Sequence, residues 1–113
     1  MNPIIWHNPR CSKSRETLAL LKDAGEDPVI INYKVDIPTE SEIRRALELL
    51  HIPASGLIRK GEAIYKELNL SDADDDALIK AMATHPELIE RPVVFANGKA
   101  ALGRPPETVL GIL

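Results

Sequence analysis

The sequence has very little of several features that define common functional classes. A single cysteine excludes an internal disulfide and a cysteine-rich metal site. Aromatic residues make up only 4% of the chain, so the core has to be built from aliphatic side chains. The apolar runs are too short for a membrane span, and polar residues interrupt the first of them where a signal peptide would need an apolar stretch. The net charge of −3 argues against a general nucleic-acid-binding role. We therefore expect a cytoplasmic protein without membrane or nucleic-acid partners.

The first third of the chain predicts a βαβ unit. Ile4–Trp6 is a short apolar run typical of a buried strand, and a helical pattern begins at about Ser12. Gly25 is placed to end that helix, and Val29–Tyr33 is a β-branched run typical of a second strand. A strand, a helix and a strand in this order imply a parallel strand pair with a right-handed crossover.

The remainder predicts helices and then a hairpin. Thr39 and Glu42 have the spacing of a capping box, and residues 54–85 have a broken helical pattern that includes a short element at Leu57–Gly61. Asn97-Gly98, the favoured pair for a two-residue hairpin turn, separates two short apolar runs. The chain closes with a helix that is expected to bury Val109, Leu110 and Leu113.

This order of elements is that of a thioredoxin-like fold. The length suits a single domain over residues 1–113, with a helical insertion at about 39–90 between the two halves. We expect an α/β fold with a mixed central sheet. In that architecture the strand after the insertion begins with a cis-proline that faces the cysteine loop, and Pro92 stands in that place.

Cys11 is the main candidate for chemistry. It falls at or just before the N-terminus of the first helix, where unpaired amide groups and the helix dipole favour an anion. Arg10, Lys13 and Arg15 add positive charge, so the thiol is expected to ionise more easily than a free one. The alternative is a buried structural thiol. Ser14 stands where a redox CxxC motif has its second cysteine, so any resolving sulfur must come from another molecule.

His7 and three arginines are further candidates. His7 lies four residues before Cys11 and either stabilises the thiolate or merely fills hydrogen bonds in the loop. The planar guanidinium group suits an oxyanion ligand, and three arginines lie beside predicted loops or breaks, although surface ion pairs are the alternative for each. These three are Arg59, Arg91 and Arg104.

Motifs along essentially the whole chain resemble the glutaredoxin-coupled arsenate reductase family. They are His7–Arg15, Leu57–Lys60, Tyr65–Leu68, His85-Pro86, Arg91–Val94 and Gly103–Glu107. The resemblance implies a thioredoxin-like fold with a helical insertion, and reduction of arsenate to arsenite with glutathione and glutaredoxin as electron donors. It implies that Cys11 is the nucleophile, that His7 favours its thiolate, and that Pro92 is the cis-proline. It also implies that the oxyanion is held by Arg59, Arg91 and Arg104.

We accordingly predict a monomeric arsenate reductase that binds no metal and no organic cofactor and uses glutathione as a co-substrate. Two other functional classes stay open. One is a monothiol glutaredoxin-like protein that binds glutathione, with or without an iron–sulfur cluster. The other is an Spx-like regulator that binds RNA polymerase. Arg91 before the predicted cis-proline favours an oxyanion over glutathione, because glutathione-binding folds usually have Thr or Val there.

Overall fold

The computed structural model describes residues 2–113, and these divide into two compact units. The first unit comprises the chain up to Asp36 together with Arg91–Leu113, and the second comprises Ile37–Glu90. The second unit corresponds in range to the helical insertion expected at about 39–90. The prediction that the whole chain is one domain stays a prediction. Within residues 2–113, none of the helices has the length and apolar character needed to cross a membrane.

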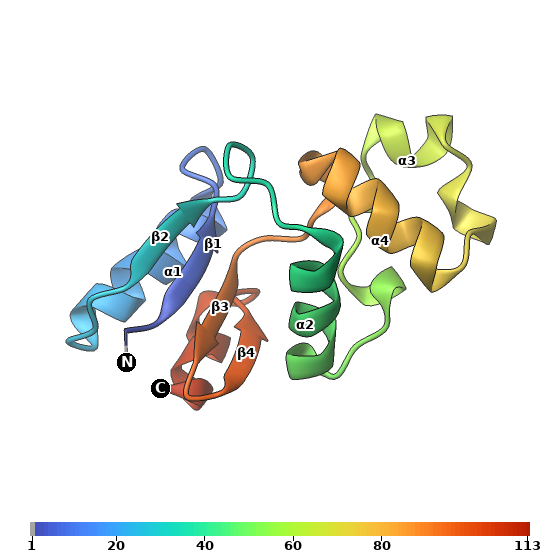
Figure 1. The fold of residues 1–113 in the computed structure, drawn as a ribbon. Helices are drawn as coiled ribbons and strands as arrows, with labels where there is room; N and C mark the ends of the chain where they lie inside the picture. The colour runs from blue at the N-terminus through green and yellow to red at the C-terminus, as the bar shows by residue number, and fades with distance from the viewer. Residues whose placement is uncertain (1) are drawn as a thin grey trace. The chain divides into compact units, whose positions relative to one another are not determined.

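The first unit is built on a four-stranded mixed sheet with the strand order β2-β1-β3-β4 (Figure 1). Strand β1 pairs in parallel with β2 and antiparallel with β3, and β3 pairs antiparallel with β4. The predicted α/β class, the βαβ unit and the mixed sheet are therefore confirmed. The elements of this unit are β1 (Ile4–His7), α1 (Ser12–Asp23), β2 (Val29–Asn32), β3 (Val93–Ala96), β4 (Lys99–Leu102) and the 3₁₀ helix η4 (Pro106–Ile112).

Local signals set the ends of these elements as predicted. Helix α1 ends in a Schellman motif, in which Glu26 N–H donates to the Leu21 carbonyl and Gly25 N–H to the Lys22 carbonyl. Gly25 has a φ of +83°, a conformation that glycine adopts without a steric penalty. Asn97 and Gly98 both have positive φ, at 53° and 72°, as a type I′ hairpin turn requires.

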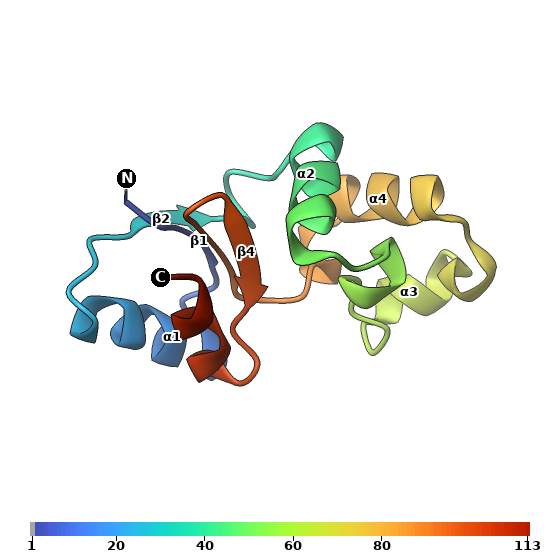
Figure 2. The same ribbon diagram turned by 90° about the horizontal axis from the view of Figure 1, so that it is seen from below.

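Helix α1 and η4 pack side by side against one face of the sheet (Figure 2). The core between them contains Ile5, Leu21, Val94, Ala101 and Val109. The last helix was expected to bury Leu110 and Leu113, but these are 43% and 36% exposed. That prediction was wrong because it assumed an α-helical period. With three residues per turn, η4 places Pro106, Val109 and Ile112 on one face.

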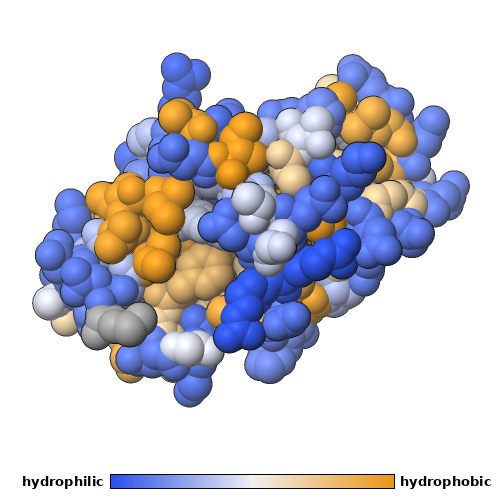
Figure 3. All heavy atoms as spheres, viewed as in Figure 1, coloured by the Kyte–Doolittle hydropathy of each residue, from blue (hydrophilic) through white to orange (hydrophobic). Residues whose placement is uncertain are grey.

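The outer strand β2 is only half covered. Val29 and Ile30 are 48% and 47% exposed, and Figure 3 shows apolar side chains gathered over this strand. An edge strand with an open apolar face is unusual enough to need protection against pairing with other chains.

The second unit is helical. Its elements are α2 (Glu40–Leu50), η1 (Ala54–Gly56), α3 (Ala63–Glu67), η2 (Leu70–Asp72), α4 (Asp75–Thr84) and η3 (Pro86–Leu88). The predicted capping box is present, since Thr39 Oγ1 accepts from Glu42 N–H at 3.1 Å and Glu42 accepts from Thr39 N–H at 3.0 Å. Helix α2 packs against α4.

The short helical element expected at Leu57–Gly61 is not formed. Ile58 instead makes an antiparallel β-bridge with Ile89. Two backbone hydrogen bonds flank that bridge, from Arg59 N–H to the Leu88 carbonyl at 2.7 Å and from Glu90 N–H to the Leu57 carbonyl at 2.8 Å. The backbone pairs with a segment about thirty residues away, which a local helical pattern does not anticipate.

Candidate active site

Cys11 is the N-cap residue of α1, as the sequence predicted. Its φ and ψ of −92° and 124° are extended, and its carbonyl accepts the first helical hydrogen bond from Arg15 N–H at 3.0 Å. A turn delivers it there, because Cys11 N–H donates to the Asn8 carbonyl at 3.0 Å and Arg10 N–H donates to Asn8 Oδ1 at 3.0 Å. Arg15 closes the loop by donating to the Pro9 carbonyl at 2.9 Å. The thiol is thus held at the positive end of the helix.

The surroundings of Cys11 favour its thiolate. Burial raises the pKa of the thiol, but the backbone amide of Ser14, the charge of Arg91 and the amide of Lys13 together bring that pKa below its ordinary value. The Cys11 side chain makes no capping hydrogen bond to these amides, which act on the sulfur through their dipoles. A further contribution of the Arg91 side chain, through hydrogen bonding to the sulfur, lowers the pKa of the thiol in the same direction. A thiol whose pKa is lowered in this way forms its nucleophilic thiolate more readily than a free thiol does.

His7 contacts Ser14. It is 7% exposed, and its Nδ1 lies 2.6 Å from Ser14 Oγ. The same hydroxyl accepts from Asn8 N–H at 2.9 Å. Burial is the main cause that lowers the pKa of His7, and the charges of Arg15 and Lys22 lower it further, so the imidazole is neutral at pH 7. The contact gives His7 a route to Cys11 through Ser14, whose amide acts on the sulfur.

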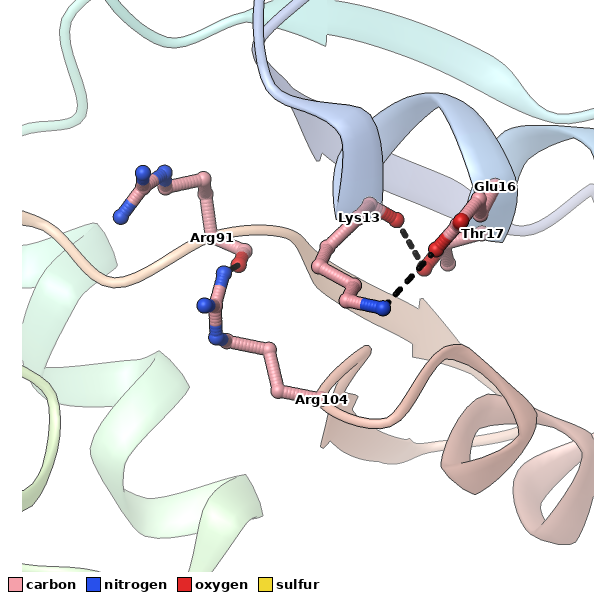
Figure 4. Close-up of polar contacts among 5 residues, drawn as sticks. All are labelled: Lys13, Glu16, Thr17, Arg91 and Arg104. Atoms are coloured by element: carbon pink, nitrogen blue, oxygen red, sulfur yellow. Dashed lines mark hydrogen bonds and ion pairs between the residues drawn. The ribbon is translucent and has the colours of Figure 1, made fainter.

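Arg91 and Arg104 lie at the same end of the hairpin. Arg91 is two residues before Val93 and Arg104 two residues after Leu102, and Val93 and Leu102 are paired across the strands. The Arg104 Nη1 group donates to the Arg91 carbonyl at 3.2 Å, while the Arg91 side chain extends away from Arg104 (Figure 4). The peptide bond between Arg91 and Pro92 is cis, the configuration that the resemblance implied, and the bond between Arg104 and Pro105 is also cis.

Arg59 belongs to the second unit. Its backbone is fixed by the bridge at Ile58, and its side chain forms an ion pair with Glu62, three residues on. The two charged side chains are 28% and 31% exposed. Its predicted role in holding an oxyanion at Cys11 stays a prediction.

The structure adds groups that sequence reasoning did not assign to the site. Ser14 entered only as the missing second cysteine, yet it is fully buried, bonds His7 and Asn8, and offers its amide to Cys11. A hydroxyl residue in the first turn of a helix that starts at a cysteine is the signal that could have found it. Among the described residues, no three or more His, Cys, Asp or Glu side chains gather as a metal site would require.

The fold and site define a class, a thioredoxin-like protein with a single activated thiol at the start of its first helix. The ArsC family model matches residues 6–112, and the chain belongs to the ArsC family. It is 51% identical over 112 residues to the uncharacterized protein YfgD of Escherichia coli K12, covering 96% of this chain and 94% of the relative. It is 46% identical over 112 residues to an arsenate reductase of Neisseria meningitidis serogroup A, covering 96% of each. The structure of an arsenate reductase from Vibrio cholerae superposes with a TM-score of 0.96 at 52% identity, covering 100% of this chain and 98% of that one.

Proposed function

We propose that this protein is an arsenate reductase that draws its electrons from glutathione and glutaredoxin. The observation that carries the proposal is the activated thiol, since the amides of Ser14 and Lys13 and the charge of Arg91 converge on Cys11. The full-length similarity to proteins named arsenate reductase supports arsenate as the substrate. A negatively charged oxyanion suits a site that combines a helix N-terminus with guanidinium groups.

The first chemical step is a substitution at arsenic. The Cys11 thiolate attacks As(V), a sulfur–arsenic bond forms, and an arsenate oxygen leaves as water after protonation. No electrons change hands at this stage. Arg91 and Arg104, with Arg59 as the third member that the resemblance implies, hold the oxyanion and offset its charge. His7 supports the thiolate through its contact with Ser14.

The second step is the reduction. A glutathione thiolate attacks the Cys11 sulfur, and the electron pair of the sulfur–arsenic bond stays on arsenic, which becomes As(III) and leaves as arsenite. The two sulfurs are oxidised to a mixed disulfide. The thiolate of glutaredoxin then takes up the glutathionyl group and releases the Cys11 thiolate. An external thiol is needed because Cys11 is the chain's only cysteine.

A coupled assay tests this function. NADPH consumption is followed with glutathione reductase, glutathione and glutaredoxin, with arsenate present or omitted, and Cys11→Ser serves as the inactive control. We expect arsenate-dependent turnover by the wild-type protein and none when thioredoxin and thioredoxin reductase replace glutathione, glutaredoxin and glutathione reductase. Turnover on thioredoxin alone contradicts the electron path. Glutathione-linked turnover of a disulfide substrate without any response to arsenate supports the glutaredoxin-like alternative instead.

A further inference from the structure

Gly103 lies where the segments that form the Cys11 site come together. It is buried, it directly follows β4, and it precedes Arg104. Its N–H donates to the Pro92 carbonyl at 3.0 Å, so the backbone before Arg104 is tied to the backbone after Arg91. Helix α1 covers the remaining side of this residue through Thr17.

The space at Gly103 excludes even a methyl group. A Cβ atom added there would overlap the hydroxyl oxygen of Thr17 and would lie 2.7 Å from Pro92 Cγ and 3.1 Å from Thr17 Cγ2. Favourable contacts between non-bonded carbon atoms lie at about 3.5–4.0 Å. An added side chain therefore requires α1 or the Pro92 ring to move.

Neither Thr17 nor Pro92 can move away from an added side chain at low energetic cost. Thr17 is fully buried and β-branched, so its χ1 is restricted, and its hydroxyl donates to the Lys13 carbonyl at 2.8 Å (Figure 4). Pro92 is a buried ring with no rotamer to change. A side chain at position 103 would therefore displace the backbone of α1 or of the segment at Pro92.

Each neighbour of Gly103 leads to a group that acts on Cys11. Thr17 is bonded to the first turn of α1 at Lys13, whose amide acts on the Cys11 sulfur. Pro92 follows Arg91, whose guanidinium acts on the same sulfur. Arg104 follows Gly103 and donates to the Arg91 carbonyl. We propose that Gly103 is a positioning residue of the active site, because only a residue without a side chain lets these three segments meet. The inference rests on the proposed function only for the choice of arsenate as substrate.

The test is Gly103→Ala, with the pH dependence of Cys11 alkylation by iodoacetamide as the first readout. We expect the thiol pKa to rise, because the Lys13 amide or the Arg91 guanidinium moves away from the sulfur. We also expect kcat/KM for arsenate to fall by about ten-fold or more. If Gly103 only supports the fold, Gly103→Ala lowers the melting temperature and leaves the thiol pKa of the folded protein unchanged. That outcome overturns the proposal.

Two further variants keep the result decisive. Gly111→Ala is the matched control within the same unit, since a Cβ there meets nothing within 4 Å, and it should leave both readouts at the wild-type value. Thr17→Ala removes the closest obstructing atoms, so Gly103→Ala should have a smaller effect in that background. If Gly103→Ala alone is too unstable to assay, the double variant is compared with Thr17→Ala. Pro92 Cγ still lies 2.7 Å from the added Cβ in that background, so a smaller change in thiol pKa and kcat/KM is expected, and identical values overturn the proposal. The alkylation readout needs no arsenate, so it still decides the role of Gly103 if the proposed function fails.

Discussion

Arginines of the two units lie beside different kinds of group. In the second unit Arg59, Arg44 and Arg45 are paired with carboxylates, namely Glu62, Asp76 and Glu48. In the first unit the Arg91 guanidinium acts on the Cys11 sulfur, and Arg104 donates to a backbone carbonyl. A guanidinium paired with a carboxylate has to leave that partner or share it before it can bind an anion. The charge of Arg91 already acts on the Cys11 sulfur, which makes this arginine well placed to bind an anion at the thiol.

The largest expected effect is at Arg91. Arg91→Ala removes a positive charge beside the thiol and a proposed ligand of the oxyanion, so kcat/KM for arsenate should fall by about a hundred-fold or more. The thiol pKa should rise in the same variant. Arg91→Lys should also be impaired, because a point charge cannot reproduce the planar donors. Steady-state kinetics and alkylation measured against pH give both quantities, and an Arg91→Ala protein with wild-type alkylation behaviour contradicts the role.

Arg104 comes next. Arg104→Ala removes one proposed charge-assisted contact to the oxyanion and the hydrogen bond to the Arg91 carbonyl, and we expect a loss in kcat/KM of roughly ten- to a hundred-fold. The effect should not add to that of Arg91→Ala, because the two residues are in contact. The double variant measures this coupling. Strictly additive losses would show that the two arginines act independently.

Arg59 tests whether an arginine of the second unit also takes part in the reaction. If it acts with Arg91 and Arg104 as the resemblance implies, Arg59→Ala should lower kcat/KM by about ten-fold. Glu62→Gln then sharpens the result, since it removes the competing carboxylate and should lower KM for arsenate. No change in either variant would remove Arg59 from the site and leave a pair in place of the triad.

His7 should make folding stability depend on pH. Burial, and then the charges of Arg15 and Lys22, lower its pKa below the ordinary value of 6.5. The unfolded chain therefore takes up a proton at His7 near pH 6.5, while the folded protein does so only at lower pH. The contribution of neutral His7 to folding stability is complete above the unfolded pKa of 6.5. It is lost as the pH falls through the lower pKa of the folded protein. Melting temperatures between pH 7 and pH 5 should fall less steeply for His7→Asn than for the wild type.

Arg44 and Arg45 should show the smallest effect. Their side chains are 47% and 65% exposed in ion pairs of the second unit. Exposed pairs contribute at most about 1 kcal/mol to stability. Arg44→Ala and Arg45→Ala should therefore keep kcat/KM within about two-fold of the wild type. A large loss in either would mean that the second unit contributes more to catalysis than its ion pairs indicate.

Features set by neighbouring residues could be predicted from the sequence, and those set by distant partners could not. The capping box at Thr39, the helix end at Gly25 and the turn at Asn97 depend on hydrogen bonds and backbone angles within a few residues. The local sequence is therefore enough to predict them. The element at Leu57–Gly61 was misassigned because Ile58 pairs with Ile89, far along the chain.

The same limit applies to the site. Cys11 at a helix N-terminus follows from a strand, a turn and a helix read in order. The contact of Arg104 with the Arg91 carbonyl follows from the pairing of β3 with β4. The packing of Gly103 against Thr17 depends on how β4 and α1 meet, and no local pattern encodes that meeting. The cis bond at Pro92 was expected from the order of the elements and from the family resemblance, not from the local residues. The neighbours of Arg59, Arg91 and Arg104 in the sequence mark them as candidates, but their partners depend on the fold.

The half-covered strand β2 has a consequence for handling the protein at high concentration. An open edge with apolar side chains is a template for adding a strand from another molecule. Only four residues form this strand, and Asp27 and Pro28 stand directly before it. A charge and a proline beside an apolar strand act as gatekeepers against aggregation. Replacing Asp27 or Pro28 with an apolar residue would therefore lengthen the apolar edge strand and lower the solubility of the protein. Val29→Lys would instead make the protein easier to concentrate.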